Sequence, residues 1–494
     1  MEGSDKAVVG SKAVRAAAWG YAGSLAKVLI QLVAQAVLAR ILGPGEYGVF
    51  AIGLVVVSLS IFFADSGAGA ALIQRATNEP EIISFAFGIQ LLLGVVVTAL
   101  IWLLAGPIAE FYREPRAEII IRVLGLVVFI TAASSVSASL LKRQLDFKTL
   151  QFGQVAGFFT GYILVGIPVA LAGGGVWSLV FAWLVQALVT AAWWYRKVTH
   201  PLRPRFSSPG GKGLLNFGGA TIVSNLSTWA SSNVDKIVVG RVMSSASLGL
   251  YTVPFTLLGT VAAQILATLQ PVLFSASSRF ANDIGALRRS YLSVLESVAL
   301  LLLPVFATVA VIPEVVLNGI YGPRWVDAAS IMQAASVGMA FYTLGALGTP
   351  ILWAMNRVKK EAVPQMFATL ILLIVSIYLA QFSASNVAWG VAAVSLGRTI
   401  WVLRLVCQAL DMNWKDALRA LLPAAIAACL CAMAATAMAN SLTVFDIQAV
   451  LVLGLVVICS ALVLALAVLM MKGRILSPDL DSRVGSLIRR VYSR

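Results

Sequence analysis

Long apolar stretches recur along the chain from Ala13 to Met471, separated by short polar breaks. Each is roughly 20–27 residues long, enough for a helix to cross a hydrocarbon core about 30 Å thick. The stretches are continuous, whereas an outer-membrane barrel needs strands of about 10 residues with alternating polarity. The pattern therefore predicts an all-α integral membrane protein.

Fourteen transmembrane helices are expected. The predicted spans are residues 13–38, 47–73, 82–105, 117–140, 149–172, 175–195, 213–239, 247–271, 291–312, 328–351, 362–382, 387–409, 417–439 and 446–471. The fifth and sixth spans are separated only by the tight turn Ala172-Gly173-Gly174-Gly175.

Composition supports the membrane assignment. Apolar residues make up 60% of the 494-residue chain and charged residues 12%, whereas soluble domains have about 45–50% and about 25%. A water-soluble fold could not bury so much apolar surface, so lipid must cover it. The four cysteines lie inside predicted spans and are interpreted as small core residues, not as a disulfide framework or metal site. No cofactor is predicted.

Positive charge predicts the orientation, because cytoplasmic loops retain Lys and Arg. With the N-terminus inside, the cytoplasmic segments hold most of the 36 basic residues, and the opposite loops hold only Arg40, Arg113, Arg116, Arg241 and Arg324. Both termini are therefore predicted to be cytoplasmic, and the helical spans predict an inner rather than an outer membrane. This bias largely explains the net charge of +15, so nucleic-acid binding is not needed to account for it.

Weak internal repeats divide the chain into two lobes. Arg40 precedes Gly48 by the same interval as Arg241 precedes Gly249, and a Pro-Arg pair ending at Arg116 recurs later in the same topological position. Two six-helix repeats share one orientation when an axis along the membrane normal relates them. The predicted parts are an N-terminal lobe (1–195), a cytoplasmic linker (196–212), a C-terminal lobe (213–409), two extra helices (410–471) and a cytoplasmic amphipathic tail (472–494).

Several segments carry a family resemblance. They are Ala39–Gly48 (ARILGPGEYG), Asp65–Gln74 (DSGAGAALIQ), Asp235–Arg241 (DKIVVGR), Pro271–Arg279 (PVLFSASSR) and Tyr321–Trp325 (YGPRW). The chain resembles the Wzx-type polysaccharide transporters of the multidrug/oligosaccharidyl-lipid/polysaccharide exporter superfamily, in particular the colanic-acid and succinoglycan exporter branch. The resemblance implies fourteen helices, two six-helix lobes and an undecaprenyl-diphosphate-linked oligosaccharide as substrate.

The first predicted span carries a stripe of polar residues that includes a charged residue, Lys27. Lys27 lies about 18 Å beyond the inner edge of the membrane, too deep for its side chain to reach the headgroups. It shares one helix face with Ser24, Gln31 and Gln35. An ionisable residue at this depth is a functional hypothesis, and a lysine suits a diphosphate. The alternative is a structural pair with a buried acid such as Asp65.

The seventh span, which the repeat relates to the first, carries a second stripe of Thr221, Asn225, Thr228, Ser232 and Asp235. Two such stripes predict the walls of a shared hydrated cavity, although small polar residues at this spacing also hold transmembrane helices together. Arg398, in the twelfth span, is a second candidate for the diphosphate. Arg15 is a third, at the cytoplasmic edge, where it is alternatively an orientation signal.

Three functions are considered for a chain with these features. A flippase would move lipid-linked oligosaccharide units from the cytoplasmic to the periplasmic leaflet by alternating access of the lobes, together with a polysaccharide polymerase and export machinery. A multidrug cation antiporter of the same superfamily needs buried carboxylates, whereas the first span has a lysine and no acid. A membrane polymerase or ligase needs a large external loop. No catalytic residue and no glycine-rich nucleotide loop is present, and flipping is favoured.

Overall fold

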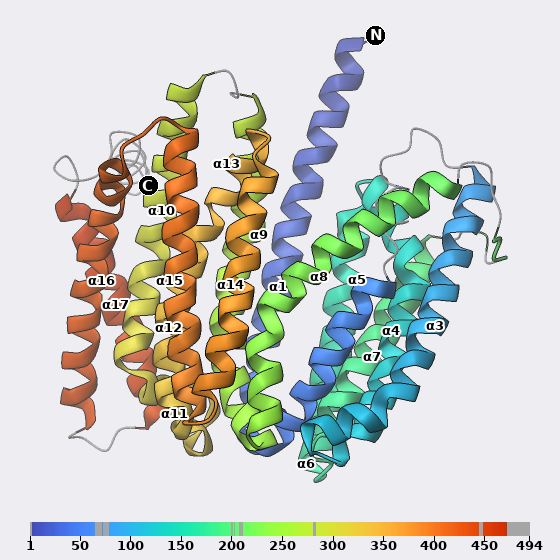
Figure 1. Ribbon diagram of the computed structural model, residues 1–494, viewed down its shortest axis with the longest axis horizontal. Coiled ribbons are helices and arrows are strands. Elements are labelled where there is room, and N and C mark those ends of the chain that lie inside the picture. The colour runs from blue at the N-terminus through green and yellow to red at the C-terminus, as the bar shows by residue number, and fades with distance from the viewer. Residues whose placement is uncertain are drawn as a thin grey trace. The chain divides into compact units, whose positions relative to one another are not determined.

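The computed structural model describes residues 2–64, 72, 79–198, 201, 203–206, 211–279, 283–443 and 448–471, and these residues form helices and turns without a strand. The helices, shown in Figure 1, are α1 (Glu2–Ala64), α3 (Pro80–Tyr112), α4 (Arg116–Arg143), α5 (Phe147–Phe158), the π-helix η1 (Phe159–Gly166), α6 (Ile167–Leu171), α7 (Trp177–Lys197), α8 (Gly211–Val242), α9 (Ser245–Arg279), α10 (Ile284–Val311), α11 (Pro313–Tyr321), the 3-10 helix η2 (Pro323–Ala328), α12 (Ala329–Ala346), α13 (Gly348–Ala354), α14 (Val358–Leu379), α15 (Ala384–Ala409), α16 (Trp414–Thr443) and α17 (Ala449–Met471).

The chain divides into two compact units, Met1–Gly249 and Leu250–Arg494. In this division α8 belongs to the first unit, whereas the repeat pattern assigned the same segment to the second lobe. The lobe boundaries at 195 and 213 therefore stay predictions. The predicted linker, 196–212, includes the last two residues of α7 and the first two of α8. The predicted amphipathic tail, 472–494, lies outside the described residues.

The multi-span helical character of the chain is confirmed. Within the described residues, 12 helices are long and apolar enough to cross a membrane. The predicted span 13–38 and residues 47–64 of the predicted span 47–73 lie in one helix, α1, which is counted once. The fifth and sixth predicted spans are separate, because a turn with Gly173 at φ 83° and Gly175 at φ 53° divides them. The count of fourteen stays a prediction.

A single residue bends α1 where the sequence predicted a loop. Gly43 has φ 75° and ψ 175°, a conformation that side chains other than glycine rarely adopt. Pro44 follows and lacks the N–H that a continuous helix would use. Across the bend, the Tyr47 hydroxyl donates to the Gln35 carbonyl at 3.3 Å. The two halves of α1 thus correspond to the first two predicted spans.

The repeat-related glycines lie where two backbones meet within the first unit. A Cβ on Gly48 would overlap the Ser245 carbonyl, and a Cβ on Gly249 would overlap the Pro44 carbonyl. Glycine is required at both positions because any side chain would push the two segments apart. The spacing noticed in the sequence therefore has a packing cause.

Charged side chains join helix ends in the same region. Arg116 Nη1 lies 3.0 Å from Glu46 Oε1, and Arg116 Nε lies 2.9 Å from Glu114 Oε1. The Ser245 hydroxyl donates to Glu114 Oε2 at 2.7 Å, and the Val176 N–H donates to Glu46 Oε2 at 2.6 Å. Partial burial raises the pKa of Glu114, but hydrogen bonds from Arg116 and Ser245 and the Arg116 charge outweigh it, so that pKa lies below its usual range.

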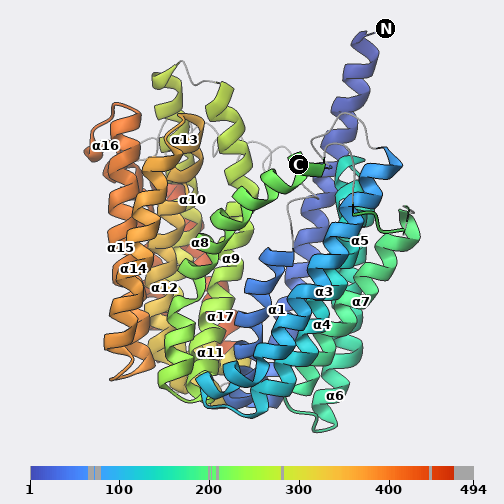
Figure 2. The same ribbon diagram turned by 45° about the vertical axis from the view of Figure 1, so that its right-hand side comes forward.

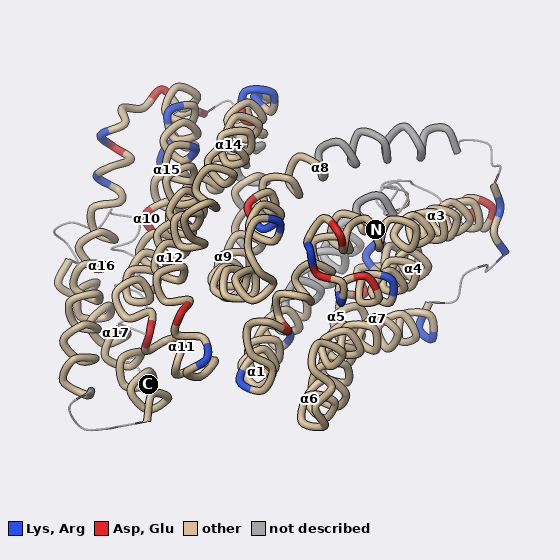
Figure 3. The backbone as a smooth tube through the Cα atoms, turned by 60° about the horizontal axis from the view of Figure 1, so that its bottom comes forward, with Lys and Arg blue, Asp and Glu red and all other residues tan. Residues whose placement is uncertain are grey.

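Helices within each unit pack through small residues, as is usual where lipid surrounds a bundle. In the first unit, α3 packs along α4, and α4 and α5 both pack against α7, as Figures 1 and 2 show from two directions. In the second unit, Ala299, Ala424, Ala427 and Ala467 form a core where α10, α16 and α17 meet. In Figure 3, many of the Lys, Arg, Asp and Glu residues lie near helix ends, and long tan sections carry none of them.

Candidate substrate site

Lys27 lies in the first half of α1, between Trp19 and the bend at Gly43. Its side chain is half-buried, and so are Ser24, Gln31 and Gln35 on the same helix face. Gly23 approaches Gln151 of α5 so closely that a Cβ there would overlap it. This part of α1 therefore packs directly on α5 and presents its polar stripe beside that contact.

Within the described part of the chain, Lys27 forms no ion pair with a carboxylate. Asp65, which the sequence offered as a structural partner, lies outside the described residues. A half-buried ammonium at membrane depth loses much of its hydration and gains stability when an anion approaches it. The geometry is compatible with a phosphate-binding role for Lys27.

The second predicted stripe lies on α8. Thr228 and Ser232 are exposed and Asp235 is buried, while the side chains of Thr221 and Asn225 lie outside the described residues. The Ser232 hydroxyl donates to the Thr228 carbonyl at 3.0 Å, and Lys236 Nζ donates to the Ser232 carbonyl at 2.9 Å. Whether the two stripes line one cavity stays a prediction. The Arg15 side chain is likewise outside the described residues.

Arg398 of α15 has a carboxylate partner that the sequence prediction did not provide. Its Nη2 lies 3.6 Å from Oε1 of Glu361 on α14, and the two side chains are only 13% and 11% exposed. The Thr349 hydroxyl donates to the same carboxylate oxygen at 3.2 Å. The guanidinium also lies 5.8 Å from the ring centroid of Tyr342. Its Nε is buried without a hydrogen-bond partner among the described residues.

The sequence prediction missed Glu361 because of a boundary error. The eleventh span was predicted to begin at residue 362, which leaves Glu361 in the preceding polar segment. The structure begins α14 at Val358 and places Glu361 in its first turn, buried. Because α14 begins four residues before the predicted span, Glu361 is buried in the helix beside Arg398 and is not part of an exposed polar segment. The position of Glu361 directly before an apolar span could have indicated that it belongs to the helix.

Comparison with known proteins settles the family. Residues 37–330 match the family described as "Polysaccharide biosynthesis protein", which is more than half of the 494-residue chain. The chain belongs to this family.

Two relatives are similar to the chain at low sequence identity. The chain is 22% identical over 323 residues to the teichuronic acid biosynthesis protein TuaB of Bacillus subtilis (strain 168), covering 65% of this chain and 67% of that protein. It is 21% identical over 369 residues to the lipopolysaccharide biosynthesis protein WzxC of Escherichia coli (strain K12), covering 73% and 74% of the two chains. The family resemblance identified in the sequence is confirmed.

Solved structures share the fold. The lipid II flippase MurJ in an inward closed conformation superposes with a TM-score of 0.69 at 14% identity, over 92% of this chain and 98% of that one. An inward-facing multidrug resistance MATE family transporter of the MOP superfamily gives a TM-score of 0.60 at 14% identity, over 78% and 96%. Because a flippase and a drug transporter both match, the fold alone does not select the substrate.

Proposed function

We propose that this protein is a flippase that moves undecaprenyl-diphosphate-linked oligosaccharide units from the cytoplasmic to the periplasmic leaflet for surface-polysaccharide synthesis. The main support for this proposal is that residues 37–330 match the family. The chain also has helices that are long and apolar enough to cross a membrane. Relatives such as TuaB and WzxC are named for the biosynthesis of surface polymers. The distribution of Lys and Arg supports a cytoplasmic location for both termini.

In this proposal the isoprenoid tail stays in the bilayer while the diphosphate and sugars cross between the lobes by alternating access. Two phosphates leaving water need compensating charge. Lys27 supplies it as a compact cation, with Ser24, Gln31 and Gln35 as hydrogen-bonding neighbours. Arg15 would attract the anionic headgroup at the cytoplasmic edge. Glu361 neutralises Arg398 in part, which favours a structural role for that arginine.

The alternative of a multidrug antiporter draws on the MATE-like fold. Its cationic substrates would meet a cation, Lys27, without a carboxylate partner in the described part of the chain, and like charges repel. A polymerase or ligase would need a catalytic constellation, and the sequence offers no motif for one. The polysaccharide polymerase and export machinery are proposed instead as separate partners that receive the flipped units.

The test is a leaflet-resolved analysis of undecaprenyl-diphosphate-linked sugars in a strain that lacks this protein. Without it, we expect units to accumulate on the cytoplasmic leaflet and surface polymer to disappear, and the wild-type protein to restore both. Lys27→Ala should fail to restore them at an equal membrane level, and Lys27→Arg should restore them in part. Units that reach the periplasmic leaflet in the empty strain would disprove the proposal.

A further inference from the structure

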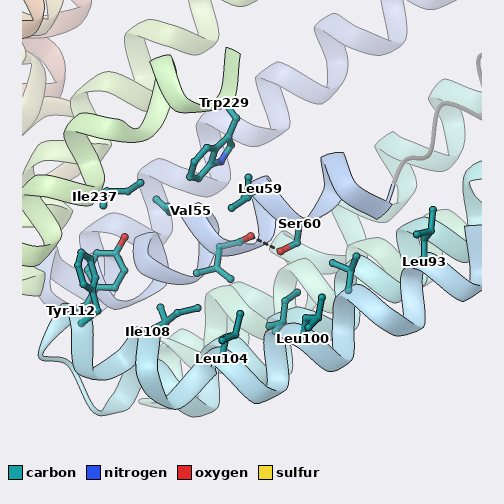
Figure 4. Close-up of a pocket in the computed structure, with 14 residues that line it drawn as sticks. Val55, Leu59, Ser60, Leu93, Leu100, Leu104, Ile108, Tyr112, Trp229 and Ile237 are labelled. Carbon is teal, nitrogen blue, oxygen red and sulfur yellow. Dashed lines mark hydrogen bonds between the residues drawn. The ribbon is translucent and has the colours of Figure 1, made fainter. Parts of the chain in front are cut away.

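An apolar groove lies within the first unit, between the second half of α1, the helix α3 and the last turns of α8 (Figure 4). It has a volume of about 540 Å³ and runs along α3 from Leu93 to Tyr112. Several of its side chains, including Leu100 and Leu104, are about half exposed. Because α1 and α3 are long and apolar enough to cross a membrane, we expect the groove to open to lipid rather than to water.

The polar groups of the groove are largely satisfied by the protein itself. The Ser60 hydroxyl donates to the Val56 carbonyl at 2.8 Å, and Trp229 Nε1 donates to the Ser58 hydroxyl at 2.9 Å. The remaining side-chain polar group of the lining is the Tyr112 hydroxyl, near the Phe111 end. An occupant of the main length of the groove therefore gains from burying hydrocarbon and not from hydrogen bonds.

A cation stands at one end of this apolar groove. The Arg241 guanidinium lies 5.3 Å from the ring centroid of Phe111, which lines the groove. Its Nη1 is buried and has no hydrogen-bond partner among the residues that the structure describes. The residue as a whole is only partly buried, and the guanidinium carries further N–H groups, for which an anionic oxygen is the natural partner. A hydrocarbon groove that ends at an unpaired cation matches an anionic lipid.

We propose that this groove binds one acyl chain of an anionic phospholipid, with the headgroup phosphate at Arg241. The site is distinct from the proposed transport path. With about 3.6 residues per turn, Trp229 and Ile237 lie on a face roughly 130° around α8 from the stripe of Thr228, Ser232 and Asp235. The occupant is therefore a lipid of the surrounding bilayer that stabilises the packing of α8 on α1 and α3.

The length of the groove makes it possible to distinguish a phospholipid from a longer lipid by experiment. One leaflet of the hydrocarbon core is about 15 Å deep. Along α3, Leu104 lies about 10 Å from Phe111, and Leu93 lies about 27 Å from it. An acyl chain anchored at Arg241 passes Leu104 and stops short of Leu93. A polyprenyl chain would fill the groove past both residues.

The experiment is native mass spectrometry of the purified full-length protein, titrated with phosphatidylglycerol or phosphatidylcholine. We expect phosphatidylglycerol to be retained preferentially by the wild type. Arg241→Gln and Leu104→Trp should each weaken that retention at least tenfold, and Arg241→Lys should recover part of it. Leu93→Trp should leave it unchanged. Arg122→Gln is the matched control, because Arg122 is an arginine on neighbouring α4 that is paired with Glu118 at 2.7 Å.

Thermal midpoints of all variants, measured without added lipid, separate lost binding from misfolding. Equal retention of the two phospholipids by the wild type, or unchanged retention in both Arg241→Gln and Leu104→Trp, would overturn the proposal. Retention of a polyprenyl phosphate that Leu93→Trp also abolishes would replace the phospholipid with that occupant. The flippase proposal is tested separately, because the leaflet analysis of Lys27 variants does not depend on this groove.

Discussion

Lys27 and Arg398 are both cations within predicted transmembrane helices, but their surroundings differ. Arg398 faces Glu361 across 3.6 Å, with Thr349 bound to the same carboxylate. Lys27 has no carboxylate partner in the part of the chain that the structure describes. A neutralised cation has already offset its desolvation within the protein, whereas an unpaired one still gains from an incoming anion. This difference favours Lys27 over Arg398 as the cation that we propose for the substrate diphosphate.

The largest effect should come from breaking the Arg398 pair. Glu361→Gln leaves a buried guanidinium without its counter-charge, which typically costs about 3–5 kcal/mol. We expect a clear drop in the thermal midpoint of the purified protein, measured at a fixed scan rate. The double variant Glu361→Met/Arg398→Met should recover most of that loss, because no buried charge is left unpaired.

An unchanged midpoint in Glu361→Gln would show that the pair does not stabilise the fold. The comparison would also fail if the double variant lost transport while it kept a normal midpoint and an equal membrane level. In that case Arg398 would contact the substrate, as the sequence first suggested.

A second test gives Lys27 the carboxylate that it lacks. Gln31 lies one helical turn from Lys27, so Gln31→Glu places an acid within reach of its ammonium. We expect transport to fall about tenfold, equivalent to about 1.4 kcal/mol, although Lys27 is still present. Surface polymer and leaflet-resolved lipid-linked sugars measure the effect.

Gln31→Met is the matched control, because it removes the amide without adding charge and should retain more transport than Gln31→Glu. Equal activity of Gln31→Glu and the wild type, at equal membrane levels, would contradict the need for an unpaired cation on α1.

The smallest effect concerns a pair that lies in the exposed ends of the helices. Arg116 is 53% exposed, so its pairs with Glu46 and Glu114 should contribute at most about 1 kcal/mol. Because the pKa of Glu114 is lowered in the fold, its contribution is present above the ordinary carboxyl pKa and is lost as pH falls through the lowered value.

We therefore expect Glu114→Gln to lower the thermal midpoint slightly at neutral pH and to match the wild type in acid. A difference that grows as the pH falls would refute this sign. Comparison with Glu361→Gln then measures how much more a buried pair contributes than a solvated one.

Much of the fold could be predicted because the lipid environment simplifies the pattern. A segment in hydrocarbon must form its backbone hydrogen bonds internally, as a helix does. Long apolar runs such as those of α3 and α17 can therefore be predicted as helices directly from the sequence. The glycines Gly48 and Gly249 were visible as a repeated spacing, and the structure gives the reason as two close backbone contacts. Family membership could also be predicted, since its signature lies in these short turns.

The sequence by itself determined the membrane-spanning class, the family, and the presence of Lys27 on a polar helix face. These depend on local composition and periodicity, which a single chain displays directly. Tertiary structure alone decided that Arg398 has a carboxylate partner and that Arg241 stands at the end of an apolar groove. Those facts depend on which helices are neighbours. The Arg398 pair also depends on the alignment of α14 along α15, which brings Glu361 to the level of Arg398. Local periodicity does not encode that alignment, because long-range packing sets it.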